Sequence, residues 1–214
     1  LDYLLILADN SEICSNFAPP FSLFREYIGQ LMEYDKKFLI IGPQNAIHYK
    51  EVFPLIKNNQ LWLGYGFKGC AAHFYSPYED IATAANHREN MIRVSGVTWF
   101  TNLEISKRHE MLVMVCRYSK DDYPKYDNFD AIDVSKTIDI PCDYDGIMGV
   151  PDTMLYAFNP EQFEIIGLGN GDLAKEIGIT KNYRGRTDLA YTKEGKHKCP
   201  YSRILIRNKH PQIL

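Results

Sequence analysis

The sequence has no apolar run long enough to cross a membrane, and its cysteines form no recognisable pair. A transmembrane helix needs about 18 consecutive apolar residues, whereas the run FLIIG at residues 38–42 has only the length of a strand. The five cysteines are odd in number and widely spaced without a C-x-x-C pair, which argues against a disulfide framework or a zinc knuckle. The chain also starts without a basic segment followed by an apolar one, so we expect no secretion signal. These absences predict a cytoplasmic protein with reduced thiols, no metal and no membrane contact.

What the sequence does contain is enough apolar material for a core and an uneven distribution of charge. Of its 214 residues, 45% are apolar and 13% aromatic, which is typical of a globular chain. A chain of this mass hides roughly 70% of its unfolded surface, so we expect one domain, with or without an appendage. Residues 181–214 hold nine Lys or Arg and two Asp or Glu, whereas the other 180 residues hold 15 basic and 25 acidic side chains. An acidic body with a basic end suits a protein that meets a polyanion, although a solvated lysine-rich surface has the same composition.

Strand and helix patterns alternate in the first half of the chain. Residues 12–17 predict a short strand that ends at a Pro-Pro corner, and residues 37–43 predict an apolar strand. A helical stripe lies between them, formed by Leu23, Tyr27, Leu31 and Tyr34. A second short helix and three strands are predicted at residues 49–59, 61–67, 97–103 and 110–118. This alternation predicts an α/β fold with parallel strands, in which ligands bind at the carboxyl ends of the strands and therefore at the corner.

The rest of the chain is less regular. Residues 69–93 are polar, small and aromatic without a clear period, and such a segment between strands is usually functional or mobile. Eight Asp between residues 121 and 145 lack the compact spacing of a calcium loop, so we assign them to turns. His109 lies in the stretch KRHE, but no Ser or Cys nucleophile is indicated near it, and we predict no general base there. Residues 163–169 and 201–209 predict two late strands.

The stretch SNFAPPFSLF, residues 15–24, has two interpretations. Prolines commonly start helices, so Pro19 and Pro20 could be no more than a stiff turn between a strand and a helix. The alternative is a site for an exocyclic amine on a base, where an Asn side-chain oxygen and a Pro carbonyl accept hydrogen bonds from the NH₂ group. The fixed φ of proline would keep such a loop rigid. An aromatic ring that stacks on the base contributes roughly 1–3 kcal/mol, which offsets much of the cost of extruding the base from a duplex.

Several long blocks of the sequence, in the same order, resemble the EcoRI-type adenine-specific DNA methyltransferases. They are PPFSLFREYI with KKFLIIGPQNAIHYKEVFPLIKNNQLWLGYGF, then GVTWFTNLEISKRHE, YPKYDNFDAIDVSKTIDIPCDYDGIMGVP, NPEQFEIIG and YSRILIRNK. The resemblance covers most of the chain and implies a Rossmann-like methyltransferase sheet. It also implies transfer of a methyl group from S-adenosyl-L-methionine to an adenine amino group in double-stranded DNA. Such enzymes act in restriction-modification beside a cognate restriction endonuclease, or as orphan or phage-borne enzymes.

The corner itself departs from the family pattern. The family has Asn directly before Pro-Pro-Phe, whereas this chain has Ala18 there and Asn16 two positions earlier. If the strand ending ICSN sets the register, Asn16 is the catalytic residue and the next two residues are an insertion. If the prolines set the register, Ala18 stands in its place. We favour the first alignment, under which the catalytic residues are Asn16, Pro19, Pro20 and Phe21.

A second departure concerns the cofactor. In the family a glycine-bearing or acidic cofactor loop precedes the catalytic corner, but only fifteen residues precede Asn16 here and they hold no glycine. We therefore expect the N-terminal cofactor part to be missing, and we assign no cofactor-binding residues. The alternative function is a catalytically inactive DNA-binding relic or fragment of that fold. Methylation of a different amine, in RNA or protein, is a more remote alternative.

DNA-contacting residues are predicted in two places. In the irregular segment, Arg88 and Arg93 can reach base edges in the major groove, although a plain mobile loop is an equally good interpretation. In the basic end, KNYRGR and KEGKHK interleave Tyr with cations, and we prefer phosphate contact to a solvated surface. We predict a catalytic core at residues 1–118, with a recognition insertion near 69–93, and an irregular DNA-facing portion at 119–214. The predicted phosphate-contacting residues are Lys181, Arg184, Arg186, Lys193, Lys196 and Lys198.

Overall fold

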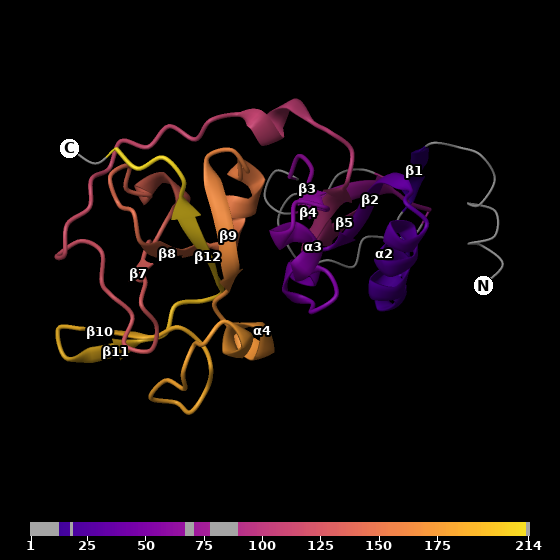
Figure 1. Cartoon of the computed structure of the whole chain (residues 1–214). Helices are drawn as coiled ribbons and strands as arrows, with labels where there is room; N and C mark the ends of the chain where they lie inside the picture. The colour runs from indigo at the N-terminus through magenta and orange to yellow at the C-terminus, as the bar shows by residue number, and fades with distance from the viewer. Residues whose placement is uncertain (1–12, 18, 67–70, 78–89, 213–214) are drawn as a thin grey trace. The chain divides into compact units, whose positions relative to one another are not determined.

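The computed structural model describes residues 13–17, 19–66, 71–77 and 90–212. The chain divides into two compact units, Leu1–Leu103 (unit 1) and Glu104–Leu214 (unit 2) (Figure 1). The functional division after residue 118 that the sequence suggests stays a prediction. Within the described part of the chain, no helix has the length and apolar character needed to cross a membrane.

Unit 1 is built on a four-stranded mixed sheet with the order β1–β2–β6–β3. β1 (Ile13–Phe17) pairs parallel with β2 (Lys37–Pro43), while β6 (Val97–Thr101) runs antiparallel to β2 and to β3 (Trp62–Leu63). β1, β2 and β3 therefore point the same way. The prediction that the fold combines helices and strands in an α/β arrangement is confirmed. The prediction of a sheet with parallel strands throughout is wrong, because β6 lies between β2 and β3 and runs in the opposite direction.

The connection from β1 to β2 is a 3-10 turn, η2 (Phe21–Leu23), followed by the helix α2 (Phe24–Glu33). The buried residues of α2 are spaced three and four apart, as an amphipathic helix requires; they are Phe24, Tyr27, Ile28 and Leu31. The predicted helical stripe is therefore confirmed at Tyr27 and Leu31, which are buried. It is wrong at Leu23 and Tyr34, which are exposed. Both are cap residues that flank the helix, so they do not share its buried face.

The ring of Phe24 fixes α2 against the sheet. It packs on Phe100 of β6 with ring centroids 5.0 Å apart, and both side chains are fully buried. It also lies against Gly42 of β2, where a Cβ atom would overlap the ring. After β2, the chain continues through η3 (Gln44–His48) and α3 (Phe53–Lys57) to β3. This close packing between α2 and β2 sets the direction in which the chain leaves β1.

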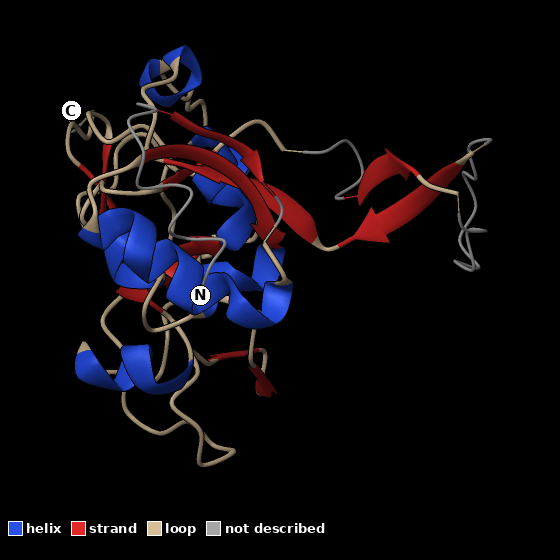
Figure 2. Cartoon of the chain, turned by 90° about the vertical axis from the view of Figure 1, so that its right-hand side faces the viewer, coloured by secondary structure: helices blue, strands red, loops and turns tan. Residues whose placement is uncertain are grey.

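β4 (Ala71–Tyr75) and β5 (Met91–Ser95) pair as an antiparallel ribbon that extends from the sheet (Figure 2). Its base joins the sheet because Ala72 packs with Ile41 and Val97 in a small buried cluster. The prediction of an irregular segment at residues 69–93 is thus wrong where these strands lie. The sequence does not indicate this ribbon, because neither strand alternates between buried and exposed side chains.

Unit 2 contains a second four-stranded sheet with the order β7–β8–β12–β9. β12 (Arg203–Asn208) is antiparallel to β8 (Ile147–Pro151) and to β9 (Phe163–Leu168), and β7 (Ile132–Asp133) is parallel to β8. The two late strands predicted from the sequence are confirmed as β9 and β12. The remaining elements of unit 2 are η5 (Ser106–His109), η6 (Thr137–Asp139), η7 (Asp152–Ala157), α4 (Gly171–Glu176), β10 (Tyr191–Lys193) and β11 (Lys196–Lys198).

The prediction of a strand at residues 110–118 is wrong. Its side chains do alternate between exposed and half-buried, as the sequence pattern indicates. However, its backbone forms one isolated bridge, between Cys116 and Pro141, instead of a ladder. The Gln162 side chain takes the place of a neighbouring strand, because it bonds both the N–H and the carbonyl of Leu112 at 2.8 Å.

A buried ion pair joins β7 to β12. The Asp133 carboxylate accepts hydrogen bonds from the Tyr126 hydroxyl at 2.6 Å and from Nε of Arg203 at 2.9 Å. The side chains of Asp133 and Arg203 are 1% and 12% exposed. Burial raises the pKa of Tyr126 well above its ordinary value. Burial opposes the charge on Arg203, but the hydrogen bond to Asp133 raises the pKa of this guanidinium overall.

Candidate functional site

The Pro-Pro corner lies at the carboxyl edge of the sheet in unit 1. Because β1, β2 and β3 point the same way, their carboxyl ends meet at one edge, where α/β sheets bind ligands. Pro19 is buried and Pro20 is exposed. The Pro20 carbonyl accepts the Leu23 N–H at 2.9 Å, which closes the 3-10 turn η2. This turn leaves the Phe21 side chain 41% exposed, so an aromatic ring is available to a ligand at the corner.

The end of β1 contains a β-bulge. Ser15 pairs with Leu39, and Phe17 pairs with Ile40, so Asn16 is an extra residue between two consecutive partners on β2. A bulge re-aims the chain and is common beside active sites. The Asn16 side chain and all of Ala18 lie outside what the structure describes, so the choice between these two positions stays open.

The same edge carries polar and aromatic groups that follow β2 and β3. Asn45 is exposed on η3 and accepts a hydrogen bond from the Tyr49 hydroxyl at 3.4 Å. The Arg25 guanidinium of α2 lies 4.2 Å from the centre of the Tyr49 ring. Tyr65 follows β3 and is 61% exposed. Sequence reasoning missed the contact of Arg25 with Tyr49, because nothing in the local pattern relates α2 to the segment after η3.

Most of the predicted phosphate-contacting residues gather on one part of unit 2. β10 and β11 form a hairpin, and the loop at residues 181–186 is joined to it by Tyr183, whose ring stacks on His197 with centroids 4.7 Å apart. We call the exposed cations of this loop and hairpin the basic surface; they are Lys181, Arg184, Arg186, Lys196 and Lys198. Lys193 differs, since it is half-buried and its ammonium donates to the Asp121 carbonyl at 3.3 Å.

The two predicted base-contacting arginines belong to unit 1. Arg93 is half-buried on β5, directly opposite His73 of β4. Arg88 lies outside the described residues. Among the described residues predicted to bind DNA, Arg93 therefore lies on the ribbon of unit 1 and the others lie in unit 2.

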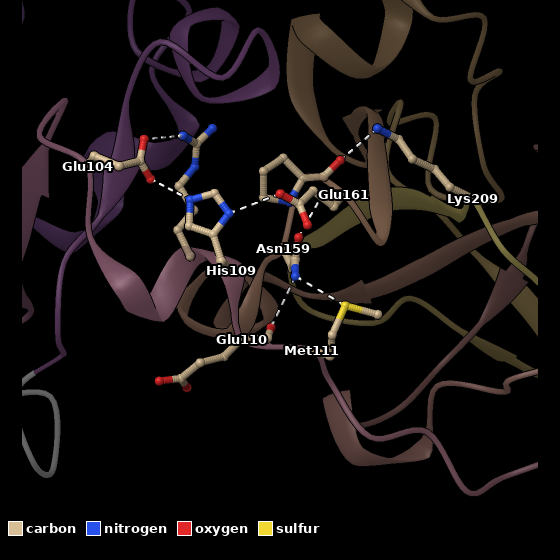
Figure 3. Close-up of polar contacts among 9 residues, drawn as sticks. Glu104, His109, Glu110, Met111, Asn159, Glu161 and Lys209 are labelled. Carbon is tan, nitrogen blue, oxygen red and sulfur yellow. Dashed lines mark hydrogen bonds and ion pairs between the residues drawn. The ribbon is translucent and has the colours of Figure 1, made fainter.

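His109 lies between two carboxylates in unit 2 (Figure 3). Its Nε2 is 2.7 Å from Glu104 and its Nδ1 is 3.1 Å from Glu161. The hydrogen bond to Glu104, followed by that to Glu161, raises the pKa of His109. Hydrogen bonds from both ring nitrogens to carboxylates favour the charged form of the imidazole. That His109 is not a general base stays a prediction, and the geometry makes His109 a link between η5 and the turn before β9.

With this geometry established, comparison with known proteins decides the family. A family model described as adenine-specific methyltransferase EcoRI matches residues 4–209. The chain belongs to this family. The resemblance recognised in the sequence blocks is thereby confirmed. No solved structure matches the chain.

Relatives within the family include three named type II methyltransferases. The chain is 47% identical to M.EcoRI of Escherichia coli over 201 residues, which cover 91% of this chain and 57% of that protein. It is 33% identical to M.MpnI of Mycoplasma pneumoniae over 219 residues, 98% of this chain and 68% of the relative. It is 36% identical to M.MgeORF184P of Mycoplasma genitalium over 200 residues, 89% of this chain and 63% of the relative. The chain therefore spans between about half and two thirds of the length of these relatives.

The family membership raises the question of a cofactor site. Within the described part of unit 1, Gly42 and Gly64 face the side chains of Phe24 and Trp99, and a Cβ at either position would crowd those side chains. Gly96 has a positive φ and turns the chain into β6. These three glycines therefore serve packing and a turn, and they do not supply a backbone cradle for a nucleoside-bearing cofactor.

Proposed function

We propose that the chain is the catalytic and DNA-contacting part of an adenine-specific DNA methyltransferase. The reaction is transfer of a methyl group from S-adenosyl-L-methionine to the exocyclic amino group of adenine in a specific sequence of double-stranded DNA. The observation that carries the proposal is the diproline corner with an exposed aromatic ring, Phe21, at the carboxyl edge of an α/β sheet in a member of this family.

The chemistry at the corner follows from the groups it offers. The amino nitrogen of adenine is a poor nucleophile because its lone pair is delocalised into the ring. The Asn16 carboxamide oxygen and the Pro19 carbonyl would accept hydrogen bonds from this NH₂ group and favour a more tetrahedral nitrogen. Pro20 holds the turn, since its carbonyl is bonded to Leu23. Phe21 would stack on the extruded base, which compensates for lost stacking in the duplex.

The remaining parts of the proposal concern context. We assign no residue to S-adenosyl-L-methionine, and no step of the mechanism above depends on a contact to it. The Rossmann-like character of the sheet is supported by β1, β2 and β3 running in one direction. We assign the enzyme to the cytoplasm and to restriction-modification, beside a cognate restriction endonuclease, by analogy with the relatives named type II methyltransferases.

A matched pair of variants tests the stacking role of Phe21. Phe21 and Leu23 lie on the same 3-10 turn, and both are exposed, at 41% and 55%. Loss of a stacking contact of roughly 1–3 kcal/mol predicts that Phe21→Ala lowers kcat/KM for N6-methyladenine formation about 5- to 150-fold. Leu23→Ala should leave it within about twofold. The measurement is mass spectrometry of digested, initially unmethylated DNA after incubation with S-adenosyl-L-methionine.

The same assay identifies the catalytic amide. Asn16→Ala should abolish methylation, whereas Asn58→Ala, an exposed Asn at the end of α3, should not. Full activity of Asn16→Ala would contradict the favoured alignment. A wild-type protein that binds both DNA and S-adenosyl-L-methionine but forms no N6-methyladenine would instead favour the inactive relic.

A further inference from the structure

We propose that the basic surface of unit 2 grips the DNA phosphate backbone without regard to sequence, and that Asn182 is the positioning residue that shapes it. This inference rests on the proposed function, because duplex DNA is its substrate. It goes further in assigning the salt-dependent part of DNA affinity to one loop and one hairpin.

The loop at residues 181–186 is closed by the side chain of Asn182. Its Oδ1 accepts the N–H groups of Arg184 at 2.8 Å and Arg186 at 3.3 Å, and its Nδ2 donates to the Asp188 carbonyl at 3.0 Å. The backbone N–H of Asn182 also donates to the Arg186 carbonyl at 2.8 Å, and Gly185 takes a positive φ of 73° within the turn. The two arginines are thus carried on a fixed backbone, which reduces the ordering cost of binding a partner.

Asn128 holds both ends of this loop to the body of unit 2. Its Nδ2 donates to the Thr180 carbonyl at 2.8 Å and to the Asp188 carbonyl at 2.9 Å, which flank the loop on either side. Its Oδ1 accepts the Ala190 N–H at 3.0 Å, just before β10. Loop and hairpin are therefore anchored at the same buried asparagine.

The loop and the hairpin also contact each other directly. The stack of Tyr183 on His197 joins them, and the Arg184 guanidinium lies 5.2 Å from the centre of the Tyr183 ring. On the hairpin, the Thr192 hydroxyl donates to Asp127 at 2.7 Å and fixes β10. The five cations of the basic surface are consequently presented as one unit.

The chemistry of this surface favours phosphates over unpaired bases. Its exposed groups are ammonium and guanidinium ions, which bind phosphate oxygens by charge and by hydrogen bonds. The aromatic ring of the loop, Tyr183, is contacted by His197 and Arg184 and is 46% exposed. The cations of this surface outnumber its aromatic rings, so a duplex backbone is the partner we infer, and single-stranded nucleic acid, which binds mainly through stacked aromatic rings, fits less well.

The test is the salt dependence of binding to a fluorescent duplex of unrelated sequence, measured by anisotropy with the full chain. Log K falls as log salt rises, and each phosphate contact contributes about 0.9 to the magnitude of this slope. One contact therefore raises the affinity about eightfold when the salt concentration falls from 1 M to 0.1 M. We expect Arg184→Gln and Lys198→Gln each to lower the magnitude of the slope by about 0.9. Lys136→Gln removes an exposed cation from unit 2 outside the basic surface and should leave the slope unchanged.

Asn182→Ala tests the positioning role, since it changes no charge. We expect it to weaken DNA binding several-fold and to lower the slope. Gln212→Ala, which removes an exposed amide of unit 2 outside the basic surface, should have no effect. The circular dichroism spectrum of Asn182→Ala should stay native. If this variant does not fold, the slopes of Arg184→Gln and Lys198→Gln still test whether the basic surface binds DNA. Equal slopes for Arg184→Gln, Lys198→Gln and Lys136→Gln, or stronger binding of a duplex RNA of the same length, would overturn the inference.

Failure of this inference is distinguishable from failure of the proposed function. At saturating DNA, Arg184→Gln should keep the kcat of methylation and raise the KM for DNA. If the wild-type chain forms no N6-methyladenine, the proposed function fails while the slopes still decide the role of the basic surface.

Discussion

Asp133 is the residue whose replacement most directly tests the framework of unit 2. It lies on β7 with its carboxylate 1% exposed, and it accepts hydrogen bonds from Tyr126 and Arg203. In Asp133→Asn the shape is kept and one acceptor oxygen remains, but the negative charge is lost. The Arg203 guanidinium, only 12% exposed, would then be buried without a counterion.

The expected cost follows from this burial. Removing one partner of a buried ion pair costs about 3–5 kcal/mol, because the other charge is left uncompensated. A domain has a total stability of about 5–15 kcal/mol, so unit 2 should lose a large part of its stability. Tyr126→Phe removes one hydrogen bond and keeps the ion pair, and it should cost only about 0.5–1.5 kcal/mol. The double variant Asp133→Asn with Arg203→Met should cost less than the two single variants added together, since it removes both charges.

Urea unfolding followed by circular dichroism measures these differences. Both tryptophans, Trp62 and Trp99, belong to unit 1, so tryptophan fluorescence does not report on unit 2. Hydrogen exchange of the β12 amides provides a signal local to the ion pair. A cost below about 1 kcal/mol for Asp133→Asn would refute the reasoning, because it would mean that Arg203 finds solvent or another partner without penalty.

Two further predictions concern packing and pH. Gly42→Ala should destabilise unit 1 by about 1–3 kcal/mol, because its Cβ overlaps the buried Phe24 ring. Gly29→Ala, exposed on α2 with nothing near its Cβ, should stabilise unit 1 by up to about 1 kcal/mol; both are read from urea midpoints. The hydrogen bonds to Glu104 and Glu161 raise the folded pKa of His109, so its contribution is fully present below the unfolded value of about 6.5 and is lost as pH rises through the folded pKa. The midpoint difference between wild type and His109→Gln should therefore shrink from pH 6 to pH 9, and a constant difference would contradict this assignment.

The parts of the fold that could be predicted from the sequence are those set by local patterns. β2, β9 and β12 are apolar runs between turn residues, and α2 shows the spacing of its buried face at Tyr27 and Leu31. The direction of β6 could not be predicted, because strand pairing depends on partners far apart in the sequence, such as Ile41 with Trp99. The prediction of a strand at residues 110–118 is wrong for the same reason. Alternation of side chains predicts an exposed and a covered face, but it does not predict whether a neighbouring strand exists.

Asparagine shows why the candidate site was harder to predict than the fold. Asn102 accepts the Phe38 N–H at 2.9 Å and donates to the Lys36 carbonyl at 2.8 Å, and Asn128 and Asn182 likewise join separate segments with one amide. A carboxamide suits this because it carries a donor and an acceptor side by side. These three asparagines stabilise loops by joining separate segments, so the presence of an asparagine does not by itself indicate catalysis. Asn16 is a candidate because it is the bulged residue of β1 just before the proline corner. Comparing the methylation activity of Asn16→Ala with that of Asn58→Ala tests whether this position makes the amide catalytic.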